Sequence, residues 1–214
     1  MVPEQSLPDP LPAEPLTLVV AWLAEATRRA DQPNPNAMVL ATCDGAGRPS
    51  ARVVLCKQID PVSGSVRFVS NYLSRKGREL AANPRAALVF HWDHLHRQVR
   101  MEGVVEQVPA ADSDSYFASR ARTSQLGAHA SRQSEPIASP AALQAQLEAA
   151  RARFSGPVPR PPHWGGYVCW IDAVELWVAG TARLHDRARW TRELSMSCSA
   201  RPVAGPWIGT RLQP

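Results

Sequence analysis

The chain has 214 residues, 44% of them hydrophobic and 20% charged, which are ordinary proportions for a globular protein and argue against intrinsic disorder. Its net charge of +5 comes almost entirely from arginine, since Lys57 and Lys76 are the only lysines, and this favours an anionic ligand. No apolar run approaches the roughly 20 residues of a membrane span, and the arginines are interleaved with predicted strands instead of gathered in one tail, so neither a membrane protein nor a nucleic-acid binder is expected.

The cysteines and the N-terminus indicate a reducing compartment. The cysteines form no Cys-x-x-Cys pair and have no zinc-like spacing, so we expect inert thiols and no metal site. Glu4, Asp9 and Glu14 precede the first apolar stretch, where a signal peptide would carry basic residues. We therefore expect a cytoplasmic protein. The four cysteines are Cys43, Cys56, Cys169 and Cys198.

The predicted elements begin with a proline-rich, acidic arm over residues 1–15, which we expect to be flexible and to have no core of its own. Apolar residues at helical spacing then predict a helix from Pro15 to the turn-rich QPNPN. Alternating stretches joined by DGAG and DPVSG predict antiparallel hairpins. The predicted strands are 38–42, 49–59, 65–70, 86–92, 97–108, 167–171, 174–179, 182–190 and 206–212, and the later helices are 74–82, 112–121, 124–131 and 140–153.

Strands early and late in the chain, with helices between them, predict one α+β domain over residues 16–214. An antiparallel β-barrel with surrounding helices is the architecture that this order favours. A proline-rich connector, residues 155–163, leads back from the helices to the strands.

The stretch SRKGREL carries a local conflict. Ser74 is a good helix cap, yet Arg75 and Lys76 occupy the first turn, where the helix dipole disfavours cations by roughly 0.3 to 1 kcal/mol each. A bound phosphate would reverse the sign of this effect, because backbone N–H groups and two cations would converge on it. A solvated surface turn is the alternative.

Other polar residues stand at suggestive spacings. Arg52 and Lys57 bracket the apolar run in RVVLCK and face opposite ways on an ideal strand unless a bulge intervenes. Tyr116, Arg120 and Ser124 share one side of a helix if that helix is unbroken, and two hydroxyls with a guanidinium suit a phosphate. Polar residues on a solvated helix surface explain the same pattern equally well.

The stretch RLHDR predicts a cationic strand face. Alternation puts Arg183, His185, Arg187 and Arg189 on one side, so a negative group should lie there or the face should be open to water. Asp186, on the other face, is expected to be a structural partner.

In order along the chain, RVVLCK, SRKGREL, RQVRMEG, YFASRARTSQLGAHASRQS, HWGGY, ELW and RLHDR resemble the pyridoxine/pyridoxamine 5'-phosphate oxidase family over nearly the whole length from Pro15 to Pro214. The resemblance implies an FMN-binding split β-barrel that works as a homodimer with FMN at the subunit interface. It also implies oxidation of pyridoxamine or pyridoxine 5'-phosphate to pyridoxal 5'-phosphate, with O2 as acceptor and H2O2 as product.

The resemblance further implies roles for individual residues. Arg183 would position the substrate and stabilise charge during catalysis, and His185 would orient the substrate. The substrate phosphate would meet Lys57, Tyr116, Arg120 and Ser124. The implied FMN-binding residues are Arg52, Val53, Val54, Leu55, Cys56, Lys57, Val69, Ser70, Arg75, Lys76, Gln98, Gln133, Ser134, Trp177 and Arg187.

The chain departs from the family pattern at several places. The N-terminal arm is short and lacks the arginine and tyrosine that close over substrate in some members, and residues 195–205 look like an insertion in the last hairpin. The substituted positions are Asn34, Val168, Leu176 and Val178. These changes bear on lid closure and on substrate preference, which the sequence does not rank.

Two other functions stay open. One is a related flavin oxidase that acts on another cyclic substrate, such as a phenazine precursor. The other is a carrier that binds flavin or pyridoxal phosphate without catalysis.

Overall fold

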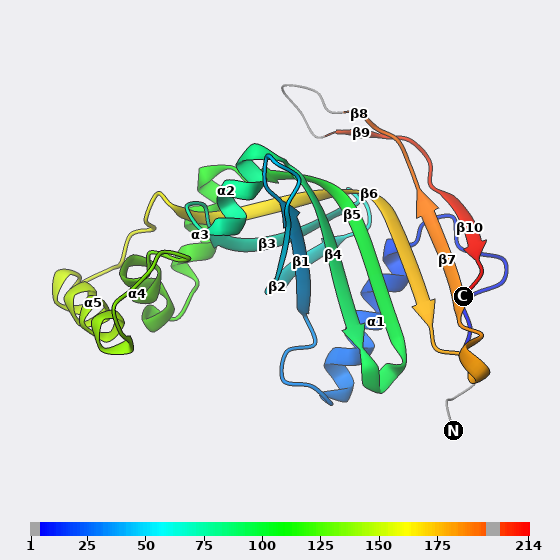
Figure 1. The fold of residues 1–214 in the computed structure, drawn as a ribbon, viewed down its shortest axis with the longest axis horizontal. Helices are drawn as coiled ribbons and strands as arrows, with labels where there is room; N and C mark the ends of the chain where they lie inside the picture. Colours follow the sequence, from blue (N-terminus) through cyan, green and yellow to red (C-terminus); the bar gives the residue numbers. More distant parts are fainter. Residues whose placement is uncertain (1–4, 196–201) are drawn as a thin grey trace.

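The computed structural model describes residues 5–195 and 202–214. Strands β1 to β6 close into an antiparallel barrel, because β6 pairs with β3 on one side and with β5 on the other (Figure 1). Between these two contacts the order is β3-β2-β1-β4-β5. The strands are β1 (Ala37–Cys43), β2 (Pro49–Asp60), β3 (Ser65–Asn71), β4 (Arg85–Trp92), β5 (Arg97–Gln107) and β6 (Trp164–Val178).

Helices surround the barrel. On α1 (Leu16–Arg29), Leu16, Val19, Trp22 and Ala26 are buried, which is the period-3.6 stripe expected of a helix lying on a core. The other helices are α2 (Arg75–Ala82), α3 (Ala110–Ala118), α4 (Arg122–Ala130) and α5 (Pro140–Arg153), with short 3-10 turns η1 (Asp93–Leu95) and η2 (Thr181–Arg183). Within the described ranges, no helix is both long enough and apolar enough to cross a membrane.

The barrel core follows from strand alternation. Leu40 on β1, Leu88 and Phe90 on β4, and Met101 on β5 are fully buried, whereas their chain neighbours are more exposed. At Gly103 a Cβ would lie 2.1 Å from the Trp170 carbonyl oxygen, so only glycine lets β5 approach β6 at the register shift between Glu102 and Gly103.

The sheet continues beyond the barrel. Strand β7 (Asp186–Thr191) pairs with the end of β6, and β10 (Ile208–Leu212) pairs with β7. A short hairpin, β8 (Leu194–Ser195) with β9 (Val203–Ala204), flanks the expected insertion 195–205, of which residues 196–201 lie outside the described part of the chain.

Two sequence predictions about the C-terminal strands are wrong. Residues 167–171 and 174–178 belong to one continuous strand, β6, which runs on through Asp172 although its register with β5 shifts there; Ala179 lies beyond its end. Arg183 and His185 are not on a strand: β7 begins at Asp186, and Ala182 and Arg183 have φ of 52° and 63° in the left-handed region.

The N-terminal segment, predicted to be a flexible arm, is packed against the rest of the chain over residues 5–15. Leu7 is only 2% exposed and packs in the main core, and its N–H donates to Asp186 Oδ2 at 2.8 Å. Trp190 Nε1 donates to the Pro12 carbonyl at 2.8 Å. Residues 5–15 therefore lie along the extension of the sheet, where burial of one leucine and these hydrogen bonds hold them.

Candidate functional site

A cleft of about 630 Å³ opens between strands β2 and β3, the start of β6 and the helices α2 to α4. Its volume falls in the range of sites for small molecules and cofactors. The lining residues are Arg52, Val53, Val54, Leu55, Lys57, Val69, Ser70, Asn71, Lys76, Tyr116, Arg120, Ser124, Gly127, Ala128, Ser131, Gln133 and Trp164.

Strand β2 forms an apolar wall of this cleft. Val53 and Leu55 are 64% and 38% exposed, unusual values for aliphatic side chains on a barrel strand. The register of β2 against β3 shifts between Cys56 and Gln58, so Lys57 is the bulged residue. Arg52 and Lys57 both line the cleft, as do Val53, Val54 and Leu55 between them.

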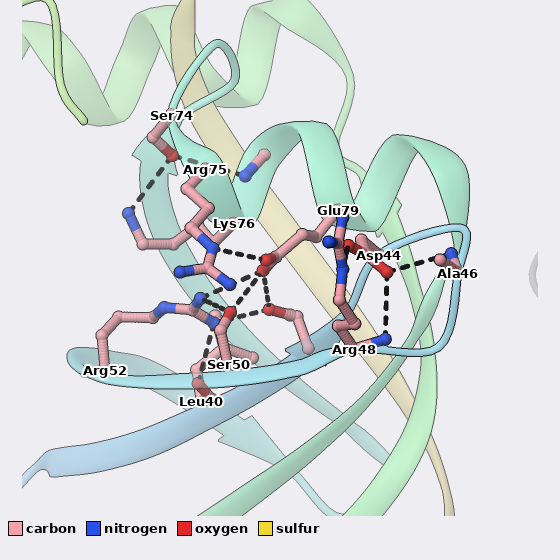
Figure 2. A network of polar contacts seen from close by, with 12 residues as sticks. Leu40, Asp44, Ala46, Arg48, Ser50, Arg52, Ser74, Arg75, Lys76 and Glu79 are labelled. Atoms are coloured by element: carbon pink, nitrogen blue, oxygen red, sulfur yellow. Dashed lines mark hydrogen bonds and ion pairs between the residues drawn. The ribbon is translucent and has the colours of Figure 1, made fainter. Parts of the chain in front are cut away.

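A buried carboxylate holds Arg52 in place (Figure 2). Glu79 Oε2 accepts hydrogen bonds from Thr42 Oγ1 at 2.5 Å, Ser50 Oγ at 2.7 Å and Arg52 Nη2 at 3.1 Å. Arg52 Nη1 also donates to Thr42 Oγ1, so each group is fixed by more than one partner. Burial alone would raise the pKa of Glu79, but the hydrogen bonds from Ser50, Thr42, Arg75 and Arg52 outweigh it and lower the pKa to about 2.

Lys76 is the most buried cation of the cleft, with 8% of its surface exposed. Its Nζ donates to Gln133 Oε1 at 2.7 Å and to Ser74 Oγ at 3.2 Å (Figure 2 shows the bond to Ser74). Burial and the charge of Arg52 lower the pKa of Lys76 to about 8, against an opposing effect of Glu79. A bound anion would compensate this ammonium directly.

The polar residues of the middle helices meet in the cleft by a route that differs from the predicted single helix. Tyr116 lies on α3, Arg120 in the turn that follows and Ser124 on α4. The guanidinium of Arg120 lies 4.4 Å from the Trp164 ring centroid, and its Nη1 is buried without a hydrogen-bond partner in the described structure. Burial lowers the pKa of Arg120, so this cation is poised for an anionic partner.

Six of the implied FMN-binding residues do not line this cleft, and three of these, Cys56, Arg75 and Ser134, are chain neighbours of residues that do. Cys56 points into the core, 4% exposed, and burial raises the pKa of its thiol to about 11. Arg75 turns back along its helix to Glu79, with Nε 2.8 Å from Oε1, and lines a separate hollow with Arg48 and Arg78. Ser134 lines another hollow, beyond Gln133.

The remaining predicted residues form a second group, which we call the distal cluster: Gln98, Trp177, His185 and Arg187, with Arg183 on the adjoining turn. Gln98 pairs with Trp177 across β5 and β6, and Trp177 pairs with Arg187 across β6 and β7. The His185 ring lies 4.6 Å from the Trp177 ring, and its Nδ1 accepts from the Gly180 N–H.

Figure 1 shows β6 as a long strand; the cleft lies at its start and the distal cluster at its end. Trp164 borders the cleft, and Trp177 follows it by thirteen positions, roughly 40 Å of strand at about 3.3 Å per residue. One subunit therefore does not bring the two groups of predicted residues together.

The cationic strand face finds its negative partners within the chain. Arg187 donates two hydrogen bonds to Glu175 Oε1, from Nη2 at 2.9 Å and from Nε at 3.2 Å. Arg189 Nη2 lies 3.1 Å from Glu102 Oε2. Glu175 is buried and also accepts from Arg100 at 3.2 Å. For Arg187 and Arg189, the predicted negative groups are thus carboxylates of β5 and β6.

Sequence reasoning missed several residues of the cleft. Trp164 stacks with Tyr116 at 6.2 Å and supports Arg120, although only the HWGGY stretch around it stood out in the sequence. Asn71 and Ser131 also line the cleft. Glu79 had no signal beyond its place in SRKGREL, because its partners on β1 and β2 are distant in sequence.

Two family models match the chain. The first is described as pyridoxamine 5'-phosphate oxidase and matches residues 24–154, and the second is described as the pyridoxine 5'-phosphate oxidase C-terminal dimerisation region and matches residues 164–214. The chain belongs to the pyridoxamine 5'-phosphate oxidase family.

Relatives and solved structures agree with this family. Two pyridoxine/pyridoxamine 5'-phosphate oxidases are similar over most of their length: one from Gluconobacter oxydans is 46% identical (95% of this chain, 96% of the relative), and one from Thermosynechococcus vestitus is 52% identical (84% of each). Among solved structures, PhzG from Burkholderia lata in complex with tetrahydrophenazine-1-carboxylic acid has a TM-score of 0.85 at 30% identity and covers 99% of this chain and 98% of its own. An FMN-binding protein from Nostoc punctiforme described as pyridoxamine 5'-phosphate oxidase-related has a TM-score of 0.72 at 14% identity (94% of this chain, 97% of its own).

The predicted α+β split barrel is therefore confirmed as the fold of this family. The substituted positions lie mostly inside it: Val168, Leu176 and Val178 are at most 6% exposed on β6, and the Asn34 carbonyl accepts from the Ala37 N–H. The three on β6 are buried and do not border the cleft.

Proposed function

We propose that this chain is an FMN-dependent oxidase that converts pyridoxamine 5'-phosphate and pyridoxine 5'-phosphate to pyridoxal 5'-phosphate. For pyridoxine phosphate, the alcohol and O2 give the aldehyde and H2O2; for the amine, water is also consumed and ammonia released. The observation that carries the proposal is the convergence of Lys57, Tyr116, Arg120 and Ser124, from separate segments, on one cleft.

The cleft fits a flavin phosphate by its own chemistry. Lys76 is a buried ammonium with a lowered pKa, Arg52 presents a fixed guanidinium, and the exposed Val53 and Leu55 offer an apolar wall to a planar ring. Bound FMN would supply the hydride acceptor that no side chain provides, and dioxygen would reoxidise it. Val54, Val69, Ser70 and Gln133 complete the proposed FMN contacts on this side.

The substrate side depends on the protein's own groups. Within the described ranges, Arg120 Nη1 is buried and has no hydrogen-bond partner, and Lys57 Nζ lies 5.8 Å from the Tyr116 ring centroid. Two cations and the Tyr116 and Ser124 hydroxyls can therefore hold a phosphate dianion. Arg183 and His185 would hold the pyridine ring against the flavin. The protein thereby binds and orients the substrate, and excludes water around the carbon that loses hydride.

We further propose a homodimer in which each site combines the cleft of one subunit with the distal cluster of the other. The support is the length of β6, which separates Gln98, Trp177, Arg187 and their turn from the cleft of the same chain. A twofold axis repeats such a shared site twice. The matched dimerisation region over residues 164–214 contains β6, β7 and β10.

The second candidate is oxidation of a phenazine precursor. It rests on the similarity to PhzG, whose solved structure holds tetrahydrophenazine-1-carboxylic acid. The relatives with pyridoxine/pyridoxamine oxidase names are 46–52% identical, against 30% for PhzG, and the cations around Arg120 suit a phosphate, so we rank it second.

The purified protein is expected to be yellow or to become so with FMN, and to release H2O2 with pyridoxamine 5'-phosphate or pyridoxine 5'-phosphate. A coupled peroxidase assay with both phosphates, their unphosphorylated forms and a dihydrophenazine carboxylic acid ranks the candidates. If the protein stays colourless after incubation with FMN, the proposal is wrong. A flavoprotein that turns over none of the phosphates but oxidises the phenazine precursor is the PhzG-like alternative, and one without any turnover is a carrier.

FMN affinity is expected to fall at alkaline pH. Because the pKa of Lys76 in the free protein is about 8 and a phosphate favours the charged ammonium, the Kd for FMN should rise roughly tenfold between pH 7 and pH 9. The charges that act on this ammonium are Arg52 from β2 and Glu79 from its own helix, while the loop after α4 contributes the neutral Gln133.

Flavin fluorescence titrations at each pH measure this Kd. Lys76→Arg, which keeps its charge through this range, should flatten the profile, and riboflavin, which lacks the phosphate, is the ligand control. A flat wild-type profile contradicts the role of Lys76.

A further inference from the structure

The turn that carries Arg183 and His185 is under backbone strain. Ala182 and Arg183 both adopt left-handed φ, a conformation that costs a non-glycine residue roughly 1 kcal/mol or more each. At Gly180 a Cβ would lie 1.8 Å from the Leu184 carbonyl oxygen, so the turn closes tightly on itself. Such a turn persists only where its surroundings hold it.

Part of that support lies on the sheet side. His185 Nδ1 accepts from the Gly180 N–H at 3.2 Å, and its ring packs on Trp177. Within the turn, Leu184 N–H donates to the Thr181 carbonyl at 3.0 Å. These contacts join the turn to itself and to β6, but they do not attach it to the rest of the extension.

Asp186, which directly follows His185, makes that attachment. Its Oδ2 accepts from the Leu7 N–H at 2.8 Å and its Oδ1 from Arg211 Nη1 at 2.7 Å. Arg211 Nη2 reaches the Pro8 carbonyl at 3.0 Å, so one carboxylate and one guanidinium tie the N-terminal segment, the start of β7 and β10 together. The 2% exposure of Leu7 fixes the segment to the core.

We propose that Asp186 is a positioning residue, which holds the Arg183–His185 turn in its strained conformation by binding the N-terminal segment and Arg211 at once. This inference rests on the proposed function, in which Arg183 and His185 face the substrate. The N-terminal segment would then act as a fixed brace of the turn.

Asp186→Asn is the direct test. An amide cannot accept at both positions, because its NH2 group meets either the Leu7 N–H or Arg211 donor to donor. We expect kcat/KM for pyridoxamine 5'-phosphate to fall at least tenfold while the Kd for FMN stays within twofold of wild type. Hydrogen exchange should accelerate at the Leu184 and His185 amides more than at amides of the barrel.

Asp172→Asn is the matched control. Asp172 pairs with Arg85 at 2.8 Å and is 17% exposed, comparable with 25% for Asp186, and it borders neither the cleft nor the turn. This variant should lose stability without losing kcat/KM. Equal kcat/KM and equal exchange at the turn in Asp186→Asn and Asp172→Asn would overturn the inference.

A chain lacking residues 2–9 removes the same brace from the other side. It should reproduce the loss of kcat/KM, and its combination with Asp186→Asn should be no worse than the more severe single change, since both changes disrupt the contact between Asp186 and the N-terminal segment. Additive losses would show that the two changes act separately and would contradict the inference. If Asp186→Asn does not fold, the truncated chain tests the inference without it. If the wild-type protein oxidises none of the substrates, the proposed function is wrong. The hydrogen-exchange result at the turn does not depend on activity and still tests the role of Asp186.

Discussion

Arg120→Ala is expected to lower kcat/KM for pyridoxamine 5'-phosphate by about 100-fold, or about 2.7 kcal/mol of transition-state stabilisation. The Arg120 guanidinium lies on Trp164, and its Nη1 is buried without a partner in the described structure, so this nitrogen is already desolvated before substrate arrives. Hydrogen bonds between charged groups in such a setting contribute roughly 1.5 to 3 kcal/mol each. Steady-state peroxide release measures the effect, and the Kd for FMN should change little.

Arg122→Gln is the control for this variant. Arg122 stands two residues away, is exposed, and donates to the carbonyls of Phe154 and Gly156 without lining the cleft. It should keep wild-type kcat/KM. A loss with unphosphorylated pyridoxamine as large as that with the phosphate would remove phosphate binding as the role of Arg120.

A heterodimer of two inactive subunits is expected to regain about half of the wild-type activity. Lys76→Ala disables the cleft of one subunit, and Arg183→Ala, which alone should reduce turnover well over tenfold, disables the turn of the other. If each site takes its cleft from one chain and its turn from the other, the mixed dimer contains one site with both defects and one intact site. Co-expression with two affinity tags isolates this species for the peroxidase assay.

The control heterodimer carries both substitutions in the cleft. A heterodimer of Lys76→Ala with Arg120→Ala, both in the cleft, has one defect in each site and should stay inactive. Recovery in neither heterodimer means that each subunit builds its site alone or that the two groups never meet, and the shared site is then wrong.

Local chemistry made much of the barrel predictable. The Ser74 cap, with its side chain accepting from the Gly77 N–H, starts α2 where the sequence placed it, and the hairpins around DGAG and DPVSG form between β1, β2 and β3. The cleft-lining members of RVVLCK and SRKGREL also meet, because β2 and α2 are both anchored through Glu79. Short-range signals sufficed for these elements.

Two failures of the sequence prediction come from contacts that strand alternation and helical spacing do not register. Alternation continued through Arg183 and His185, yet the tight approach of Gly180 to Leu184 and the support from the N-terminal segment impose a turn there. The spacing of Tyr116, Arg120 and Ser124 suggested one helix, but the Gln125 amide donates to the Phe117 carbonyl and ends α3. Strand alternation does not register a partner 179 positions away in the sequence, and helical spacing does not register a side-chain hydrogen bond to a carbonyl eight positions earlier.

The two thiols buried in the barrel have a consequence for the lifetime of the protein. Burial raises the pKa of Cys56 to about 11 and also raises that of Cys169, which is wholly inaccessible, so both remain protonated at neutral pH. Peroxide attacks thiolates, and the proposed reaction would release it next to β2, where Cys56 lies between two cleft-lining residues. Because only the backbone of Cys56 faces the cleft, peroxide released there does not meet its thiol and does not oxidise it to a sulfenic acid. The inward orientation of this side chain therefore protects the enzyme from its own product.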